Sequence, residues 1–413
     1  AYAVGGFVRD LLLRTKNIDL DIVVEGDGIQ FAKLLAEHYE GTIRTHEKFN
    51  TALVIMPDGF HIDVATARLE YYEYPAAMPT VELSSLKLDL YRRDFTINAM
   101  AISLNSEKFG TLVDFFNCQS DIKERSIRIL HNLSFVEDPT RIFRAIRFEQ
   151  RMGFTIGKHT VKLLKNAVKM NLFNRFFGKR CFTELKLIFS EENPIPAIRR
   201  MYEFDLLKFI HPTLKYDKRT ERNLNEAQRA LAWNKLLYLD EPCRQWMVYL
   251  FSILAPSSLK EMAAFCNRFE LPDRTRNFLV KEKDVSDNIL KELNRGKRLR
   301  PSEIYWLLQD RSHESLLYII ALARKKTAKK AVSHYVTNLR HTSTYVHGAD
   351  IKEMGYPAGP IYRTILNHLL EAKLDGQVHN RADEIDYIKR NYPLEKIGIP
   401  KKKKGPSRKD KNS

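Results

Sequence analysis

The sequence predicts an α+β protein, with one mixed sheet and its helices in the first third of the chain and helices alone after it. Short runs with strand-like alternation occupy the first 130 residues. From about Phe135 onward, apolar residues recur at helical spacing instead. The length of 413 residues exceeds the size of one domain, so we expect several domains.

Strand and helix signals alternate within the first 130 residues. The expected strands are Tyr2–Val4, Asp19–Val24, Ala52–Met56, His61–Thr66, Ala99–Ser103 and Leu112–Phe115. The expected helices are Phe7–Leu13 and Gly28–His38. Asp58 and Gly59 separate two of these strands and can adopt the positive φ of a tight turn, which predicts a β-hairpin.

Helical spacing continues to about Tyr392 and is interrupted by prolines. The stretch Gly348–Pro360 is expected to form a helix–loop–helix before a final amphipathic helix. The run of four lysines that begins at Lys401 opens a segment too polar to fold alone.

The chain is strongly basic. Lysine and arginine number 68 against 51 aspartates and glutamates, a net charge of +17, and +11 of it belongs to residues 1–400. A positive field of this extent attracts polyanions such as nucleic acids. No run of about 18 apolar residues occurs, so we expect no membrane partner.

The four cysteines are far apart and include no C-x-x-C pair. This spacing argues against a zinc knuckle or a disulfide framework and indicates reduced thiols in the cytoplasm. The chain does not begin with Met and starts within an expected strand, so we expect it to be a piece of a longer protein.

Three acids in the sheet region are candidates for metal-dependent catalysis. Asp19 and Asp21 stand two apart on an expected strand, so their side chains share a face. Two like charges this close favour a divalent cation such as Mg²⁺. A third acid, Asp63, can complete the site and accept a proton from an attacking hydroxyl. A lone Asp-x-Asp is otherwise typical of a solvated edge strand, but Gly5 and Gly6 before it suit a phosphate at a helix N-terminus. This layout is that of two-metal phosphoryl or nucleotidyl transfer.

Two further clusters supply hydrogen-bonding groups. Arg92 and Arg93 can present donor forks to a triphosphate, or Arg93 can form a salt bridge with Asp94 or Asp89.

Asp138 and Arg141 are three apart, which predicts a shared helix face. An acceptor beside a donor fork matches cytosine and adenine and repels the carbonyls of uracil and guanine. An acid in front of Pro139 is alternatively a helix cap.

Four motifs, in order, resemble those of the bacterial class II tRNA nucleotidyltransferases, that is, the CCA-adding enzymes with their A-adding and CC-adding relatives. They are Gly-Gly-x-Val-Arg-Asp from Gly5, Asp-x-Asp from Asp19, Arg-Arg-Asp-Phe-Thr-Ile-Asn-Ala-Met-Ala from Arg92 and Glu-Asp-Pro-x-Arg from Glu137. The family belongs to the DNA polymerase beta-like nucleotidyltransferase superfamily. The resemblance is specific over residues 1–155 and looser over Gly348–Arg390.

The resemblance implies that the 3′-hydroxyl of a tRNA attacks the α-phosphate of ATP or CTP and releases pyrophosphate, with Mg²⁺ as cofactor and no nucleic-acid template. Asp19 and Asp21 would bind the metals. The residues at the phosphates and sugar would be Gly5, Gly6, Arg9, Arg92, Arg93 and Asn98. Asp138 and Arg141 would read the base, with Glu137 orienting them. Arg144 and Arg147 would line the pocket.

The resemblance also divides the chain. The expected parts are a catalytic head at 1–130, a helical neck at 131–190, a helical body at 191–330, a tRNA-binding helical tail at 331–395 and a basic disordered tail at 396–413. Tyr71–Leu90 and Leu130–Phe135 resemble the A-adding branch, and we favour that subtype. The family usually has two glycines near positions 117 and 118, where this chain has Asn117 and Cys118.

Two alternatives remain. A bacterial poly(A) polymerase shares the head and neck motifs but usually carries a basic Gly-Arg-Arg-Phe segment, whereas this chain has His46–Ala52 there. A non-catalytic RNA-binding protein on the same fold would typically have lost one of the acids.

Overall fold

The computed structural model describes residues 1–16, 19–74, 80–171 and 178–394. The chain forms two compact units. The first contains residues 1–221 and 256–276, and the second contains residues 222–255 and the chain from Asn277 onward. The chain therefore leaves the first unit and returns to it. Among the described residues no helix is long and apolar enough to cross a membrane.

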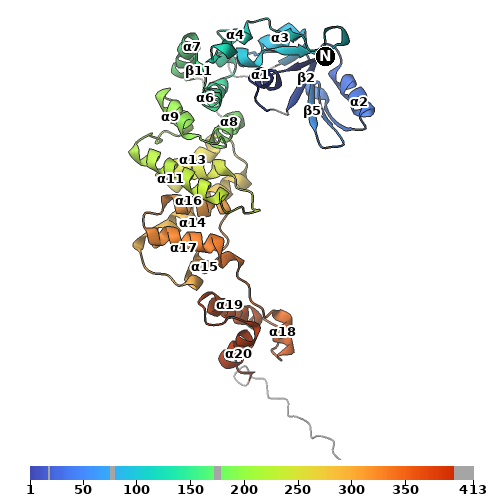
Figure 1. The fold of residues 1–413 in the computed structure, drawn as a ribbon. Helices are drawn as coiled ribbons and strands as arrows, with labels where there is room; N and C mark the ends of the chain where they lie inside the picture. The colour runs from blue at the N-terminus through green and yellow to red at the C-terminus, as the bar shows by residue number, and fades with distance from the viewer. Residues whose placement is uncertain (17–18, 75–79, 172–177, 395–413) are drawn as a thin grey trace, which may run out of the picture. The chain divides into compact units, whose positions relative to one another are not determined.

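A seven-stranded mixed sheet is the centre of the N-terminal region (Figure 1). In spatial order its strands are β3 (Thr42–His46), β4 (Thr51–Ile55), β5 (His61–Thr66), β2 (Leu20–Val24), β1 (Tyr2–Val4), β8 (Ala101–Ser103) and β9 (Leu112–Val113). The β2–β5 pair is parallel, and the other neighbouring pairs are antiparallel. The mixed sheet predicted from the sequence is confirmed.

The helices α1 (Gly6–Leu12) and α2 (Gly28–His38) lie where the sequence predicted them. Helix α2 begins after Asp27, whose carboxylate accepts a hydrogen bond from the Gln30 amide at 2.9 Å, a side-chain cap. Its apolar face packs on β3, β4 and β5 around Ala32 and Val54. The predicted hairpin is the β4–β5 pair, with Gly59 at φ +84°.

A second hairpin, β6 (Arg68–Tyr71) with β7 (Thr80–Leu83), was not predicted. The edge strand β3 was also missed, because four of its five residues are exposed and show no apolar alternation. Asn117 adopts the left-handed conformation at φ +56°, which Asn tolerates better than most residues, so the backbone there keeps a conformation that suits the glycine of the related family.

The rest of the first unit is mostly helical. Its helices are α3 (Leu86–Tyr91), α4 (Cys118–Lys123), α5 (Ser134–Glu137), α6 (Arg141–Met152), α7 (Lys158–Lys169), α8 (Lys179–Phe189), α9 (Ile195–Glu203), α10 (Leu207–Ile210) and α13 (Leu259–Arg268), with a 3₁₀ turn, η2, at Thr96–Asn98. Two short strands, β10 (Ser126–Ile127) and β11 (Thr155–Ile156), pair in parallel. Strand β11 lies within residues 131–190. We expected that segment to be helical throughout, and the structure shows that it also contains a short strand.

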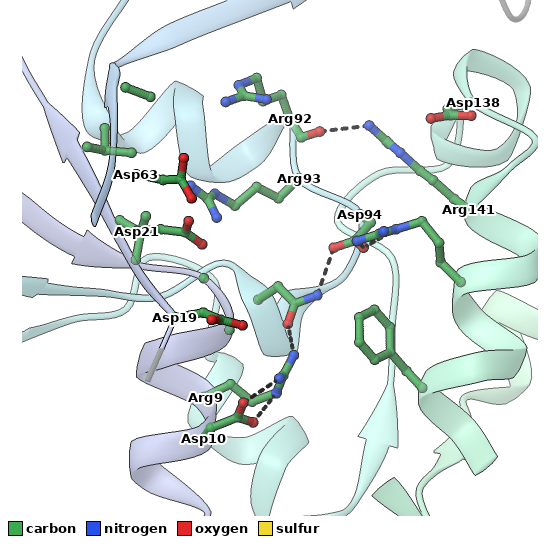
Figure 2. Close-up of a pocket in the computed structure, with 18 of the residues that line it drawn as sticks. Arg9, Asp10, Asp19, Asp21, Asp63, Arg92, Arg93, Asp94, Asp138 and Arg141 are labelled. Carbon is green, nitrogen blue, oxygen red and sulfur yellow. Dashed lines mark hydrogen bonds and ion pairs between the residues drawn. The ribbon is translucent and has the colours of Figure 1, made fainter. Parts of the chain in front are cut away.

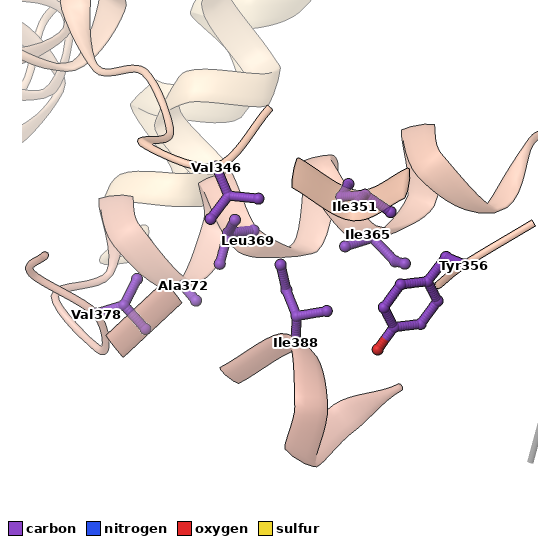
Figure 3. Packing of buried hydrophobic residues seen from close by; sticks show 8 residues of the cluster. All are labelled: Val346, Ile351, Tyr356, Ile365, Leu369, Ala372, Val378 and Ile388. Carbon is purple, nitrogen blue, oxygen red and sulfur yellow. The ribbon is translucent and has the colours of Figure 1, made fainter. Parts of the chain in front are cut away.

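Helices α11 (Lys218–Lys235) and α14 (Asp273–Arg295) run from one unit into the other. The helices wholly inside the second unit are α12 (Gln245–Ile253), α15 (Pro301–Leu308), α16 (His313–Leu322), α17 (Lys326–Thr337), α18 (Gly348–Glu353), α19 (Ile361–Leu374) and α20 (Arg381–Asn391). The stretch Gly348–Pro360 contains one helix, α18, and the loop after it, rather than the predicted helix–loop–helix, because α19 begins only at Ile361. Figure 3 shows Ile388 of α20 beside Ile365 and Leu369 of α19 in a small apolar core.

Candidate active site

A cleft of about 1060 Å³ in the first unit gathers nearly all of the predicted site residues (Figure 2). The predicted residues that line it are Gly5, Gly6, Arg9, Asp19, Asp21, Asp63, Arg92, Arg93, Asn98, Asp138, Arg141, Arg144 and Arg147. They come from α1, β2 and α6 with residues just before each, from β5, and from the segment between α3 and the end of η2. Segments more than 100 residues apart in sequence therefore line the same cleft. Glu137 is the predicted residue that does not line the cleft.

The glycine turn joins β1 to α1 at the floor of the cleft. Gly5 has φ +72° and ψ −133°, a conformation that glycine adopts without steric cost. A β-carbon at Gly5 would lie 2.9 Å from Nη1 of Arg93 and 3.4 Å from Oδ2 of Asp21. The absence of a side chain therefore lets a carboxylate and a guanidinium group approach the N-terminus of α1.

The parallel pairing of β2 with β5 places Asp21 directly beside Asp63. Asp19 immediately precedes β2 rather than lying within it. Figure 2 shows the carboxylates of Asp19, Asp21 and Asp63 pointing into the cleft. Burial raises the pKa of Asp21, the charges of Asp63 and Asp19 add to the effect, and Arg93 opposes it. Like charges thus crowd the same face, as the sequence predicted.

Asp19, Asp21 and Asp63 all line the cleft, and that Asp19 and Asp21 bind metal ions remains a prediction. Within the described ranges no group of three or more His, Cys, Asp or Glu side chains could hold a metal ion by itself. Arg93 contributes positive charge at Asp21 instead. The donor set still fits Mg²⁺, which is commonly held by one or two carboxylates together with water and substrate phosphates. Asp19 and Asp21, the two carboxylates predicted to hold such an ion, both line the cleft, and Asp63 lies beside Asp21 on the neighbouring strand.

Arg92 and Arg93 are both held by Asp89, a fully buried carboxylate on α3. The ion-pair distances are 2.7 Å from Arg92 and 3.2 Å from Arg93. Arg92 also contacts Glu70 of the β6–β7 hairpin at 2.8 Å. The salt bridge that we kept as an alternative therefore exists, and it fixes both guanidinium groups at the cleft wall. Nε of Arg93 is buried without a hydrogen-bond partner in the described part of the chain.

A hydrogen-bonded chain of charged and polar groups runs along the cleft from α1 to α8. Arg9 donates to Asn98 at 2.6 Å and to both carboxylate oxygens of Asp10. Asn98 donates to Asp94 at 2.9 Å, and Arg144 pairs with Asp94 at 2.6 Å and with Glu184 at 3.2 Å.

The same chain determines the ionisation of Asp94. Burial favours the neutral acid, but the charge of Arg144 and the hydrogen bond from Asn98 outweigh it, so the pKa of Asp94 is lowered. All three guanidinium nitrogens of Arg9 donate hydrogen bonds to Asp10 or Asn98. That Arg9 and Asn98 contact the nucleotide remains a prediction.

Asp138 does not share a helix face with Arg141, because α6 begins only at Arg141. Its backbone is extended at φ −136°, and Oδ1 accepts hydrogen bonds from the amide and hydroxyl of Thr140 at 3.0 and 2.6 Å. The capping alternative is wrong, because Thr140 is the N-cap residue of α6 and the helix has no side-chain capping hydrogen bond. Arg141 donates to Ser134 at 2.7 Å and to the carbonyl of Arg92 at 2.8 Å. Both groups line the cleft in fixed positions.

The cleft also contains residues that were not predicted from the sequence, among them Arg180, Glu70 and Tyr72. Arg180, near the start of α8, forms an ion pair with Oδ2 of Asp138. Glu70 and Tyr72 come from the β6–β7 hairpin, and the Tyr72 hydroxyl donates to Glu70 at 3.0 Å. Burial raises the pKa of Tyr72. Recognition of the β6–β7 hairpin in the sequence could have pointed to Glu70 and Tyr72. No sequence pattern near Arg180 indicates a role in the cleft.

Glu137 contacts His131 at 3.4 Å rather than Asp138 or Arg141. Burial and the charge of Arg141 lower the pKa of His131 to about 4, so the imidazole is neutral at pH 7. Burial raises the pKa of Glu137. The orienting role predicted for Glu137 remains untested by this geometry.

The site combines paired carboxylates on a mixed sheet, a glycine turn at a helix N-terminus and several arginines that line the cleft. This is the arrangement of a nucleotidyltransferase. Residues 1–128 match the family model described as the poly A polymerase head domain. Residues 153–218 match the model described as a probable RNA and SrmB-binding site of polymerase A.

Relatives that match most of the chain indicate which kind of nucleotidyltransferase it resembles. The A-adding tRNA nucleotidyltransferase of Geobacter sulfurreducens is 47% identical over 93% of this chain, and that of Aquifex aeolicus is 33% identical over 89%. A solved CCA-adding enzyme in its apo form II is 37% identical, with a TM-score of 0.78 over 94% of this chain and 91% of its own. The Thermotoga maritima CCA-adding enzyme complexed with tRNA is 35% identical, with a TM-score of 0.73 over 94% of this chain and 90% of its own.

The chain belongs to the class II tRNA nucleotidyltransferase family. It spans 44% and 45% of the lengths of the Geobacter and Aquifex relatives. The family is typically metal-dependent.

Proposed function

We propose that the protein adds the 3′-terminal A to tRNA from ATP, releases pyrophosphate and uses no nucleic-acid template. The observation that carries this proposal is that one cleft contains two sets of groups. One set is the carboxylates beside the glycine turn. The other is Asp138 and Arg141, a hydrogen-bond acceptor and a donor that can read a base. The A-adding relatives from Geobacter and Aquifex favour this subtype. CTP is the second candidate substrate.

The reacting end of the cleft supplies negative charge and a proton acceptor. In the proposed reaction the 3′-oxygen of the tRNA forms a bond to the α-phosphorus of ATP, and the bond from that phosphorus to the bridging oxygen breaks. Asp63 accepts the proton of the 3′-hydroxyl on its carboxylate. Asp21 and Asp19 would hold Mg²⁺, which would neutralise charge on the phosphates. Gly5 and Gly6 leave room for phosphate oxygens at the N-terminus of α1.

The base-reading end selects by hydrogen-bond pattern. The amino group of adenine donates to Asp138, and its neighbouring ring nitrogen accepts from Arg141. A carbonyl at the amino position, as in guanine and uracil, would face the carboxylate and be repelled. Cytosine shares the adenine pattern on this edge, so these two residues alone accept both.

The positive charge of the chain serves the tRNA partner. We propose that the helical region after the head holds the acceptor arm by its phosphates, with the neck, body and tail divided at residues 190, 330 and 395. The four cysteines are free thiols, which suits a reaction in the cytoplasm.

The test uses two tRNA substrates, one ending before the CCA and one ending in CC. With ATP and CTP both present and Mg²⁺ added, the A-adding proposal expects extension of the second substrate alone, by one nucleotide. Extension of the first substrate by three nucleotides would instead identify a CCA-adding enzyme. Extension of neither substrate would leave a non-catalytic RNA-binding protein.

A poly(A) polymerase is the second candidate, favoured by the description of the family model over residues 1–128. The same reactions, run for longer and with an unstructured RNA added, separate the two. Arrest after one A on tRNA supports the tRNA enzyme, whereas a long A tail on the unstructured RNA supports the polymerase.

A further inference from the structure

Arg180 occupies the base-reading end of the cleft, although no sequence motif points to it. It lies near the N-terminus of α8, 42 residues after Asp138, and its guanidinium group pairs with Oδ2 of that carboxylate. The other oxygen, Oδ1, is engaged by Thr140. Asp138 is thus already oriented by its neighbour in sequence, so Arg180 is not needed to hold it in place.

The base-reading end therefore has two donor forks and one acceptor. Arg141 comes from the start of α6 and Arg180 from the start of α8, and both line the cleft with Asp138. A guanidinium group has five N–H donors. The hydrogen bonds to Ser134, to the Arg92 carbonyl and to Asp138 leave donors on both arginines for a ligand. The side chain of Arg180 is 47% exposed, which leaves it free to adjust to a bound base.

Two donor groups and one acceptor match adenine better than cytosine. Adenine presents an acceptor, an amino donor and a second acceptor in sequence, at N1, N6 and N7. Cytosine presents the acceptor N3 and the amino donor N4, but a C–H group where adenine has N7. A donor beyond Asp138 would therefore gain a hydrogen bond with adenine that cytosine cannot offer.

We propose that Arg180 is a specificity-determining residue that donates to N7 of adenine and makes the site prefer ATP to CTP. The inference rests on the proposed function and deepens it, because it names the group that would separate A from C where Asp138 and Arg141 treat them alike. A charge-assisted hydrogen bond in a base-reading site separates a matched from an unmatched base by about 10- to 100-fold.

The test compares ATP with 7-deaza-ATP, which carries C–H in place of N7, as substrates for single addition to tRNA ending in CC. For the unchanged protein we expect kcat/KM to be about tenfold or more lower with the analogue. In Arg180→Ala, kcat/KM for ATP falls by the same factor, and ATP and 7-deaza-ATP become equal. CTP addition by Arg180→Ala changes by less than about twofold. Lys179→Ala removes an equal charge from the adjacent exposed position and keeps the discrimination.

Other outcomes overturn the inference. Equal use of ATP and 7-deaza-ATP by the unchanged protein excludes a contact to N7 while leaving the proposed function intact. A parallel loss of ATP and CTP addition in Arg180→Ala, with the analogue still discriminated, assigns Arg180 to the orientation of Asp138 alone. Arg180→Lys, which keeps the charge without the fork, should recover part of the discrimination. Absence of any addition to tRNA removes the proposed function and the inference with it.

Discussion

The two ends of the cleft differ in whether their charged side chains are hydrogen-bonded by other protein groups. At the reacting end, no hydrogen bond from the described part of the chain reaches the side-chain carboxylates of Asp21 and Asp63, which lie side by side on β2 and β5. At the base-reading end, Asp138 and Arg141 are each engaged by protein groups on both of their terminal polar atoms. The first end is built on a sheet, and the second on the starts of two helices.

This difference reflects what each end must bind. Crowded carboxylates raise the free energy of the empty site, and a cation that arrives with the substrate relieves it. A base is neutral and is recognised by the positions of its donors and acceptors, so its reader needs fixed groups that are already compensated. The four predictions below each weaken one end or the link between them.

The largest effect is expected at the reacting end. Asp21→Ala removes the most buried of the crowded carboxylates and should lower AMP incorporation by at least about 10³-fold, because the phosphate charge is no longer neutralised. The affinity for tRNA should change little, since the proposed tRNA contacts lie in the helical region. Single-turnover incorporation and filter binding measure the two quantities. Retained activity in this variant would contradict the catalytic role.

The link between the ends is the buried chain through Asp94. Asp94→Ala leaves Arg144 without its main partner and should lower the free energy of unfolding of the first unit by about 3 kcal/mol. Urea denaturation followed by circular dichroism measures it. Lys208→Ala breaks an exposed pair with Asp205 and is the matched control, expected to cost less than about 1 kcal/mol. Equal losses in both variants would show that the chain is not a structural link.

The base-reading end should change its selectivity rather than its turnover of every nucleotide. In Asp138→Asn, the amide and hydroxyl of Thr140 should continue to donate to the side-chain oxygen. The new NH₂ group would then take the place of Oδ2. That donor pairs with a carbonyl instead of an amino group. We expect the ratio of kcat/KM for ATP to that for GTP or UTP to fall about 10- to 100-fold. An unchanged ratio means that Asp138 does not face the base.

The smallest expected effect is a pH dependence of the metal requirement. Because the folded-state pKa of Asp21 is raised, protonation begins at a higher pH than for an ordinary aspartate. The protonated acid binds no cation, so the Mg²⁺ concentration for half-maximal incorporation should rise as the pH falls toward the raised pKa of Asp21. Magnesium titrations at several pH values measure the shift. A constant requirement across these pH values would argue against Asp21 as a ligand.

Local patterns in the sequence predicted the sheet and the reacting end well. Alternating strands and the glycine turn are local features, and the register of β2 against β5 follows from burying Ile22 and Val64. These features suffice to bring Asp21 and Asp63 together.

The base-reading end was predicted less completely, because its contacts are distant in sequence. Arg180 meets Asp138 across 42 residues, and Asp89 rather than Asp94 binds Arg92 and Arg93. The first pairing has no periodicity that a single sequence could reveal. Asp89, by contrast, stands three and four residues before Arg92 and Arg93, a helical spacing that made it one of the two alternative partners of Arg93. The position of one acid also differs from the expectation: strand pairing aligns Asp21 with Asp63, whereas Asp19 lies before β2 and not within the predicted strand.

The return of the chain to its first unit bears on how the protein is made. Helix α13 belongs to that unit, and the rings of Phe265 and Phe269 lie 6.3 and 5.6 Å from that of Phe182 on α8. A growing polypeptide that has emerged only as far as residue 221 therefore lacks part of this apolar contact. We expect the catalytic half to mature on the ribosome only after residue 276 has left the exit tunnel, later than its N-terminal position suggests.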